Sequence, residues 1–396
     1  MNILVVSHYH NDSSPTAIFI HDQVKAYAAL GHRVRVIVPI ALGKSGFFKG
    51  ERFHSDMDMI DGVEHFFVRH LSISHYGVNG FNTRRAITAI ARQYDRLFAD
   101  FLPDIIHAHT LGFDSDIGAW LKSRLRVPLV VTTHGSDTFI PYRKGRFDWL
   151  SEKPDSADHV VAVSSVLAEK LASCGTKTPI SVILNGFRVQ TLPAVKEKVP
   201  CSVVQVGYLI ERKRVDTTIC AFAQIRRAHP SACLTVIGRG KEKESLMRLC
   251  ADKGVSDSVH FIGQLPNEKV LAHMACAQFF CMPSVREGFG IVYLEAMASG
   301  CITIGTEGEG ITDLIEHGKN GFLVPPASPE AIVQVIEWCL VHPQAADAIA
   351  QRGKQDVMAL TWEANAKKYI DLFKELVFYY YLTQTSLMRR ESIADA

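Results

Sequence analysis

The chain lacks the features that mark several large classes of protein. It has almost no net charge, since 43 Lys and Arg residues face 41 Asp and Glu residues, and this excludes a general nucleic-acid binder with a strong basic excess. Its nine cysteines form no C-x-x-C pair, so we expect reduced, buried thiols in a cytosolic protein. No apolar run reaches the ~18 residues of a membrane-spanning helix. The apolar run at the N-terminus is too short for a signal peptide.

Several cofactor and metal signatures are also missing. The first apolar run leads into Ser7-His8-Tyr9-His10 rather than G-x-G-x-x-G, and the chain has no G-x-x-x-x-G-K-[ST] sequence. These absences exclude a dinucleotide-dependent oxidoreductase and a P-loop kinase. Asp56-Met57-Asp58 matches the D-x-D pattern of divalent-ion sites, but it has no strand–helix context and we expect a polar loop. The pairs His8/His10 and His107/His109 lack further zinc ligands. We therefore expect no metal and no cofactor.

What the sequence does contain is an alternation of short apolar runs with amphipathic stretches. The runs are continuously apolar, which is typical of parallel strands covered by helices on both faces. The predicted strands are 3–6, 34–38, 65–68, 104–107, 129–132, 160–163, 181–184, 202–206, 234–237, 259–262, 279–282, 302–304 and 322–324. The predicted helices include 18–30, 83–101, 115–124, 165–173, 215–228 and 241–252. This order indicates an α/β, doubly wound fold.

The alternation is interrupted once, near residue 190. The segment 188–200 contains prolines and charges without apolar periodicity, as an interdomain linker does. We therefore predict an N-terminal domain over 1–190, a linker over 191–200 and a C-terminal domain over 201–361. A final helix over about 362–378 is expected to pack on another element, and 383–396 is expected to be frayed. Two such domains imply a cleft, lined by the carboxyl ends of their strands.

The segment 283–300 is the most informative part of the chain. A strand and a glycine-containing loop lead into a helix expected to begin near Gly290, and the amides of 289–292 would form an anion site suited to phosphate. Glu287 precedes these amides, and Glu295 lies on a helix that is apolar almost all round and is therefore expected to be buried. Taken singly, Glu287 also fits a contact with the helix dipole, and Glu295 a pair with a structural cation.

In its context, the segment from Glu287 to Glu295 resembles the E-x7-E element of retaining GT-B glycosyltransferases of family 4. Six further elements are similar to those of the family and stand in the same order, which makes the resemblance strong. They are Asp104-Ile105-Ile106-His107-Ala108-His109, Thr132-Thr133-His134-Gly135-Ser136-Asp137, Leu184-Asn185-Gly186, Val206-Gly207-Tyr208-Leu209-Ile210-Glu211-Arg212-Lys213, Ile237-Gly238-Arg239-Gly240 and Asn320-Gly321-Phe322-Leu323-Val324. The resemblance implies two Rossmann-like, parallel-sheet domains facing across a cleft, with the final helix packing back on the first domain.

The resemblance also implies a nucleotide-sugar donor held by the second domain. Glu287 would bind hydroxyls of the transferred sugar, and Glu295 would bind the ribose. The implied catalytic residues are His134, Arg212, Lys213 and Glu287. The implied donor-binding residues are Gly207, Arg212, Lys213, Phe289, Gly290, Ile291 and Glu295. Cations placed at the diphosphate would stabilise the charge that develops as the anomeric bond breaks. Outside the family context, Arg212-Lys213-Arg214 is typical of a solvated loop and His134 of a structural histidine.

The acceptor is expected on the first domain. The acceptor-side residues are Ser14, Thr16, His109, Asp137, Arg143 and Lys144. Ser14 and Thr16 stand where many relatives have a glycine-rich turn, and Asp137 either orients His134 or caps the turn. The segment 140–150 interleaves aromatic residues with three cations, so we hypothesise a contact with anionic lipid or a lipid-diphosphate acceptor. An ordinary loop packed by its own aromatic residues is the alternative.

These expectations favour a metal-independent, retaining hexosyltransferase. It would move a hexose from a UDP- or GDP-sugar to a lipid-linked saccharide of a bacterial surface polysaccharide, such as capsule, O-antigen or exopolysaccharide. We expect a cytoplasmic protein, peripheral at the inner face of the cell membrane and in contact with its anionic lipids. The sequence leaves open a nucleotide-sugar epimerase on the same two-lobed fold, or a non-catalytic sugar-binding protein.

Overall fold

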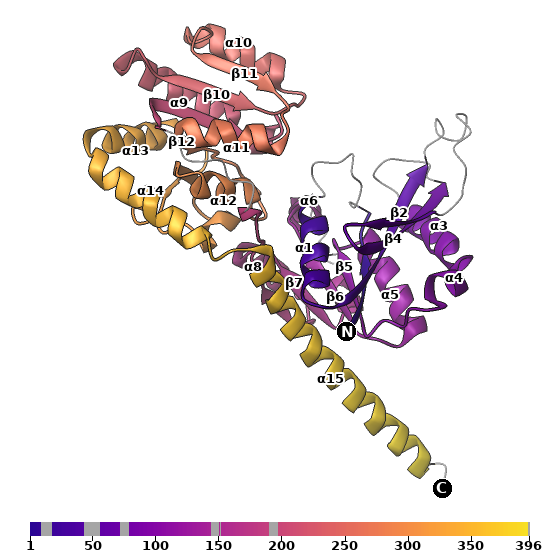
Figure 1. The fold of residues 1–396 in the computed structure, drawn as a ribbon. Helices are drawn as coiled ribbons and strands as arrows, with labels where there is room; N and C mark the ends of the chain where they lie inside the picture. The colour runs from indigo at the N-terminus through magenta and orange to yellow at the C-terminus, as the bar shows by residue number, and fades with distance from the viewer. Residues whose placement is uncertain are drawn as a thin grey trace. The chain divides into compact units, whose positions relative to one another are not determined.

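The computed structural model describes residues 1–8, 18–42, 56–71, 79–143, 150, 152–189 and 197–394. The chain forms two compact units, which Figure 1 shows. The first unit comprises Met1–Gly186 together with Trp362–Ala396, and the second comprises Phe187–Thr361. Each unit has its own sheet of predominantly parallel strands, so the prediction of an α/β fold with two doubly wound sheets is confirmed.

The sheet of the first unit has eight strands in the order β3-β4-β2-β1-β5-β6-β7-β8. They are β1 (Asn2–Val6), β2 (Arg33–Leu42), β3 (Asp56–Ile60), β4 (Val63–Leu71), β5 (Ile105–His109), β6 (Leu129–Thr133), β7 (His159–Ala162) and β8 (Ile180–Val182). All neighbouring pairs are parallel except β3 and β4. β5 and β6 are buried along their whole length, as their continuous apolar sequence predicts. The strand order reverses between β1 and β5.

The helices of the first unit include one formed by the C-terminus of the chain. They are α1 (Ile18–Ala29), α3 (Asn79–Ala91), α4 (Tyr94–Phe98), α5 (Phe113–Leu125), α6 (Ser136–Arg143), α8 (Ser165–Ser173) and α15 (Trp362–Ala394). The predicted helix 83–101 is divided into α3 and α4. The structure assigns α15 as far as Ala394, beyond the end predicted near residue 378, and no glycine or proline lies in this stretch to end the helix.

The first part of α15 packs on α1 within the first unit. The ring of Tyr27 on α1 lies 6.2 Å from that of Tyr369 and 5.8 Å from that of Phe373. The Tyr369 hydroxyl is 2.9 Å from Thr132 Oγ1 on β6, which in turn is 2.8 Å from His107 Nε2 on β5. Because these buried polar groups form hydrogen bonds with one another, α15 can pack on the first sheet without leaving them unpaired.

The sheet of the second unit has six parallel strands in the order β11-β10-β9-β12-β13-β14. They are β9 (Val199–Val206), β10 (Cys233–Ile237), β11 (Val259–Gly263), β12 (Ala277–Cys281), β13 (Ile302–Thr306) and β14 (Phe322–Val324). The helices are α9 (Val215–Ala228), α10 (Lys243–Lys253), α11 (Asn267–Cys276), α12 (Ile291–Ala298), α13 (Pro329–Val341) and α14 (Pro343–Val357). Here the strand order reverses between β9 and β12.

The antiparallel hairpin of β3 and β4 corrects one expectation. Asp56-Met57-Asp58 lies in an edge strand and not in the predicted polar loop. Asp56 pairs with Arg69 of β4 at 2.5 Å. The turn between the strands contains Asp61 and Gly62, which both have positive φ (49° and 79°), as a two-residue Asp-Gly hairpin turn requires. This Asp-Gly turn was the available sequence signal for the hairpin.

The expectations about thiols and membrane spans have mixed outcomes. All nine cysteines are free, but only five are buried and the other four are half-buried. Over the described ranges, none of the helices combines the length and the apolar character needed to cross a membrane.

Candidate active site

Two loops meet at the carboxyl edge of the second sheet, where its strand order reverses. One loop follows β9 and spans 207–213, and the other follows β12 and spans 282–290. The amide of Val285 donates a hydrogen bond to the carbonyl of Arg212 (2.8 Å), which joins the two loops. Ligands of doubly wound sheets bind at the carboxyl ends of strands where the order reverses, so this is the expected place for a site.

A buried ion pair lies where these loops meet. Lys213 Nζ donates to Glu287 Oε2, and each residue is only 8% exposed. Arg212 Nη1 lies 3.5 Å from the same oxygen, and its side chain is 37% exposed. Burial raises the pKa of Glu287, but the charges of Lys213 and then Arg212 more than offset this, so its pKa is lowered overall. The cluster therefore holds two cations and one carboxylate, with one positive charge in excess.

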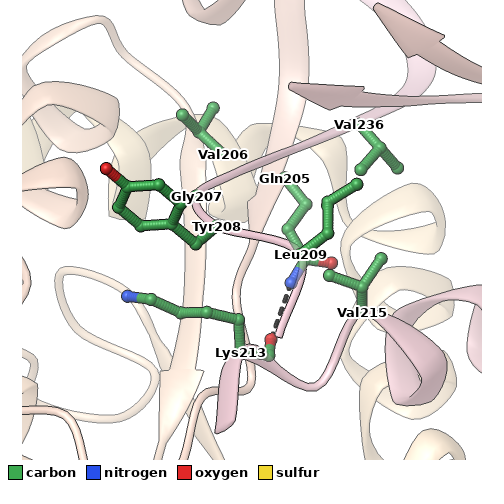
Figure 2. A pocket seen from close by; sticks show the side chains of 8 residues that line it. All are labelled: Gln205, Val206, Gly207, Tyr208, Leu209, Lys213, Val215 and Val236. Carbon is green, nitrogen blue, oxygen red and sulfur yellow. Dashed lines mark hydrogen bonds between the residues drawn. The ribbon is translucent and has the colours of Figure 1, made fainter. Parts of the chain in front are cut away.

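Lys213 also lines a small hollow, which Figure 2 shows. The hollow is narrow, and its walls are formed by residues 205–209 together with Lys213, Val215 and Val236. The Lys213 side chain and the Tyr208 ring extend to the same side of the β9 loop, while the Lys213 carbonyl accepts a hydrogen bond from Gln205 (2.9 Å). Gly207 has φ +151°, and a Cβ there would lie 3.6 Å from Lys213 Cε. Glycine thus permits a backbone conformation that side chains rarely adopt, at a point where the lysine stem passes close by.

Glu309, from the loop after β13, fixes the backbone that carries Glu287. Its two carboxylate oxygens accept the amides of Arg286 (2.8 Å) and Glu287 (2.7 Å). Arg286 has φ +58°, a left-handed conformation that costs a non-glycine residue roughly 1–2 kcal/mol. The amide of Gly310 donates to the Glu287 carbonyl (3.2 Å). The strained turn is therefore held by its neighbours in the position that brings Glu287 to Lys213.

Helix α12 begins directly after this turn. Gly290 precedes its first residue, has φ +82°, and could not carry a side chain without strain, because a Cβ would lie 2.8 Å from the Tyr293 ring. The first amides of a helix, here those of Ile291 and Val292, have no carbonyl partner within the helix and carry partial positive charge. The Phe289 side chain is buried, so only its backbone can meet a ligand.

Glu295 differs from the expectation made for it. It is half-buried rather than buried, and its Oε1 accepts a hydrogen bond from Asn267 Nδ2 at the start of α11 (2.8 Å). The apolar faces of α12 are covered by neighbouring elements, but the turn that carries Glu295 remains partly accessible. A partly accessible carboxylate can exchange hydrogen bonds with ligand hydroxyls without a large desolvation cost.

The carboxyl edge of the first sheet brings two of the predicted histidines together. His109 at the end of β5 and His134 after β6 have Nδ1 and Nε2 atoms 3.1 Å apart, and their rings are stacked. The Phe19 ring of α1 lies 4.7 Å from that of His134. Burial lowers the pKa of His134 to about 3, so its imidazole is neutral at physiological pH. A neutral imidazole both donates and accepts hydrogen bonds, as contact with a hydroxyl requires.

Asp137 caps the turn that carries His134 and does not contact its ring in the described hydrogen bonds. Its Oδ1 accepts the amides of His134 (3.1 Å) and Gly135 (2.9 Å), and its Oδ2 accepts the amide of Leu111 (2.9 Å). The Thr133 hydroxyl also donates to it (2.9 Å). Of the two roles left open by the sequence, the structure favours capping, through which Asp137 sets the position of His134 by its backbone.

The remaining predicted acceptor-side residues are not placed by the structure. Ser14, Thr16 and Lys144 lie outside the described residues, as does the side chain of Arg143 at the end of α6. Residues 144–149 of the aromatic and basic segment also lie outside them. Within the described ranges, no group of three or more His, Cys, Asp or Glu side chains is arranged to hold a metal ion.

Two family profiles match the chain in succession, and each spans most of one half. Residues 16–191 match the profile described as Glycosyltransferase Family 4, and residues 193–356 match Glycosyl transferases group 1. The chain belongs to the family 4 glycosyltransferases. The loops of the second unit that carry Lys213 and Glu287 fall within the group 1 match.

One relative and two solved structures illustrate the similarity. A GDP-mannose-dependent alpha-(1-6)-phosphatidylinositol monomannoside mannosyltransferase of Mycobacterium tuberculosis is 33% identical over 181 residues, 44% of this chain and 47% of that protein. The chain thus matches about half the length of this relative. Sucrose-phosphate synthase from Thermosynechococcus elongatus has a TM-score of 0.77 at 20% identity, covering 95% of this chain and 99% of the other. Anabaena HepE in complex with UDP and glucose has a TM-score of 0.72 at 19% identity, covering 95% and 100%. These structural likenesses establish the GT-B fold.

The sequence did not predict two features at the edges of the sheets, namely the role of Glu309 and the pairing of His8 with Asp114. Glu309 lies 22 residues beyond Glu287 in the chain, and its partners are backbone amides, which leave no residue pattern. His8 pairs with Asp114, which lies 106 residues further along the chain, so no local sequence pattern links the two residues. The resemblance carried neither group, because neither belongs to the motifs on which it rested.

Proposed function

We propose that this chain is a hexosyltransferase that takes its sugar from a nucleoside-diphosphate donor, retains the anomeric configuration and needs no metal ion. The observation that carries the proposal is the cluster of the buried Lys213 and Glu287 with the partly exposed Arg212, beside the N-terminus of α12. A diphosphate is the ligand that such an excess of positive charge and unpaired amides would favour.

The chemistry follows from where charge develops in the reaction. When the bond between the anomeric carbon and the diphosphate oxygen breaks, negative charge grows on the leaving group. Arg212 and Lys213 would stabilise that charge, as would the amides of Phe289, Gly290 and Ile291, and preorganised groups of this kind are worth about 10²–10³ in rate each. Glu287, held by Glu309, would accept hydroxyls of the transferred sugar. Among the residues that the structure describes, we identify no side chain as a nucleophile, so we propose attack from the face of the leaving diphosphate.

The other half of the donor is assigned to Glu295. Its partly accessible carboxylate, oriented by Asn267, is suited to the two hydroxyls of a ribose. The backbone at Gly207 would lie against the donor, and the neutral His134 would contact the donor sugar close to the anomeric carbon. His109 and Asp137 support His134 and would shape the side of the site that receives the acceptor.

We propose a UDP- or GDP-sugar as donor and a lipid-linked saccharide of a bacterial surface polysaccharide as acceptor. The relative named for GDP-mannose and for a phosphatidylinositol monomannoside, and the HepE structure with UDP and glucose, support these classes. Ser14, Thr16, Arg143 and Lys144 would lie on the acceptor side. The enzyme would work in the cytoplasm at the inner face of the membrane, and cosedimentation that is independent of anionic lipid would contradict the membrane contact.

A thermal-shift panel of UDP, GDP, ADP and dTDP, each with and without its sugar, tests the donor proposal. A ligand that binds only the folded state stabilises it by RT ln(1 + [L]/Kd), about 2.7 kcal/mol at 100 times Kd. One nucleoside diphosphate should raise the melting temperature most. E295Q should reduce the shift for UDP, GDP and ADP alike, because they share the ribose, and E330Q, at an exposed glutamate of the same unit, should leave the shifts unchanged. Unfolding curves that no nucleotide shifts would overturn the proposal.

Product analysis separates transfer from epimerisation. A transferase releases the nucleoside diphosphate as the sugar leaves. An epimerase that interconverts nucleotide sugars releases a product in which the nucleoside diphosphate and the sugar are still bonded. Incubation with the preferred nucleotide sugar should therefore yield free nucleoside diphosphate, with an R212A variant slower and an R248A variant, at an exposed arginine of α10, unchanged. Recovery of an isomerised nucleotide sugar alone would favour the epimerase.

A further inference from the structure

The exposed side of α15 changes character along the helix. Near its start, the side turned away from the packed Tyr369 and Phe373 is charged. Its exposed residues there are Lys367, Lys368, Asp371, Lys374 and Glu375. At the helical spacing of three and four residues, the same side continues as Phe378, Tyr379 and Leu382. These side chains are 61%, 57% and 51% exposed, so a charged face becomes apolar without becoming covered.

The change affects the whole circumference of the helix. The aromatic segment, residues 376–382, consists of Leu376, Val377, Phe378, Tyr379, Tyr380, Tyr381 and Leu382. At 3.6 residues per turn these residues reach every side of the helix. A helix that is apolar all round is normally buried, but only Leu376, Val377 and Tyr380 are even half-buried here. Figure 1 shows this end of α15 continuing past the other elements of the first unit.

The composition of the aromatic segment favours a lipid surface as the partner that covers it. A second protein helix packs against one stripe of its partner and leaves the other sides in water. The interface of a bilayer surrounds an entering helix on all sides. Phenylalanine and tyrosine suit this region, where the ring of tyrosine lies against acyl chains and its hydroxyl reaches water. Three of the four exposed side chains, Phe378, Tyr379 and Tyr381, are of these two types.

The length and charge of the sequence that follows agree with this partner. Residues 376–388 carry no charge, and Arg389 and Arg390 come directly after them. As part of α15, this stretch is roughly 20 Å long, which is less than the ~30 Å of a hydrocarbon core. It can therefore enter one leaflet without crossing the membrane. Adjacent arginines complement the negative charge of anionic headgroups.

We propose that the aromatic segment of α15, together with Arg389 and Arg390, binds the headgroup region of an anionic membrane. The inference rests on the membrane contact in the proposed function and assigns that contact to α15. Because the start of α15 packs on α1 and the first sheet, binding of its far end would hold the first unit at the membrane surface. A lipid-linked acceptor would be found at that surface.

Cosedimentation of the full chain with vesicles tests the proposal. One set of vesicles is phosphatidylcholine alone, and the other is phosphatidylcholine and phosphatidylglycerol in equal parts. The unchanged chain should bind the second set more tightly. F378Q/Y379Q/L382Q should weaken this binding by at least about tenfold, because the apolar area is no longer buried in lipid. R389Q/R390Q should weaken it by about fivefold per arginine, with the anionic vesicles alone.

A matched control replaces three other exposed apolar side chains. L102Q/M247Q/V341Q changes positions that are 73%, 50% and 71% exposed, and it should bind vesicles as the unchanged chain does. Thermal unfolding without lipid should be the same for both triple variants, since neither removes a buried side chain. A tryptophan placed in the aromatic segment by Y379W should be quenched by brominated phospholipid, and one placed by L102W should not.

The outcomes distinguish this inference from the proposed function. If F378Q/Y379Q/L382Q binds as tightly as the unchanged chain, the role of α15 is overturned and the membrane contact stands. If the unchanged chain binds neither set of vesicles, both are overturned, while nucleotide binding and sugar transfer are judged by their own assays. A lipid-free dimer in sedimentation velocity that F378Q/Y379Q/L382Q dissociates would assign the segment to a second copy of the chain and overturn the lipid partner.

Discussion

The two sheets reverse their strand order at comparable points, yet the side chains gathered there differ in charge. The second sheet presents the ionised cluster of Lys213, Glu287 and Arg212. The first presents imidazoles, and burial lowers the pKa of both His107 and His134 to about 3, which keeps them neutral. A charged edge suits a diphosphate, and a neutral hydrogen-bonding edge suits a saccharide. Under the proposed function, the same sheet topology would serve two ligand chemistries through the few residues near the ends of its strands.

The largest effect should come from removing the charge of the second edge. K213A is expected to slow nucleoside diphosphate release by about 10²–10³, because the leaving group loses a preorganised cation. It should also destabilise the second unit, since Glu287 would remain buried without its main partner, at a cost of about 3–5 kcal/mol. Steady-state kinetics and thermal unfolding measure the two effects.

A double variant separates the effect of K213A on the rate from its effect on stability. K213A/E287A should recover much of the stability and none of the rate, while K253A, at an exposed lysine of α10, should change neither. Normal turnover in K213A would show that the charge at the edge of the second sheet does not act on the leaving diphosphate.

The next effect concerns how the charged edge is held in place. E309A should lower turnover by about tenfold, because the amides of Arg286 and Glu287 lose their acceptors and the left-handed turn can relax. R286G relieves the strain of that turn and should restore part of the turnover when combined with E309A. Kinetics with the preferred nucleotide sugar would show a change mainly in kcat. A double variant as slow as E309A would mean that Glu309 does not act through the turn.

The neutral His134 imidazole of the first sheet should affect how the free energy of unfolding depends on pH. The pKa of His134 is about 3 in the folded chain and near 6.5 when unfolded, so the unfolded state binds the extra proton between these values. The free energy of unfolding should therefore fall as pH decreases from 6.5 toward 3, by up to about 1.4 kcal/mol per pH unit for this group. Denaturant titrations of H134Q should give a shallower decline, and those of H260Q an unchanged one. An equally steep decline in H134Q would show that its imidazole is charged in the folded state.

The smallest effect is expected from removing Asn267, the hydrogen-bond partner of the half-buried Glu295. N267A removes the hydrogen bond that orients this carboxylate. Since the contact is partly solvated, its loss should weaken nucleoside diphosphate binding by about fivefold or less, in line with the ~1 kcal/mol of a typical hydrogen bond. Isothermal titration with UDP and GDP measures the change, with E330Q as the control. A hundredfold loss would mean that Asn267 itself binds the nucleotide.

The sequence predicted the parts of the fold and site that depend on neighbouring residues. Buried parallel strands are continuous apolar runs, and the start of α12 follows from a glycine before an apolar helix, so both could be located. The loop with Lys213 was located through the family resemblance, because its charges alone are also typical of a solvated loop. Glu295 was misjudged because an apolar helix predicts burial without showing which turn its neighbours leave accessible.

Other features depend on contacts between distant residues and could not be predicted in this way. The pairing of His8 with Asp114 joins the ends of two different strands, and Glu309 acts on backbone amides. The polar composition of residues 383–394 predicts fraying, but no glycine or proline there ends the helix that the structure assigns as far as Ala394. The hairpin of β3 was missed because its exposed strand lacks the apolar run that marked the others.

The second unit begins and ends at one place. The amide of Phe187 donates to the carbonyl of Leu360 (3.1 Å), and Phe187 also forms a parallel bridge with Thr361. Within the first unit, Asn365 Nδ2 donates to the carbonyl of Leu184 (2.8 Å), so α15 starts beside the point where the chain leaves. Residues 187–361 are therefore organised as an insertion whose two ends adjoin. A short glycine–serine bridge from Gly186 to Trp362 should yield a free-standing first lobe, and residues 187–361 could be exchanged for those of a relative as a cassette.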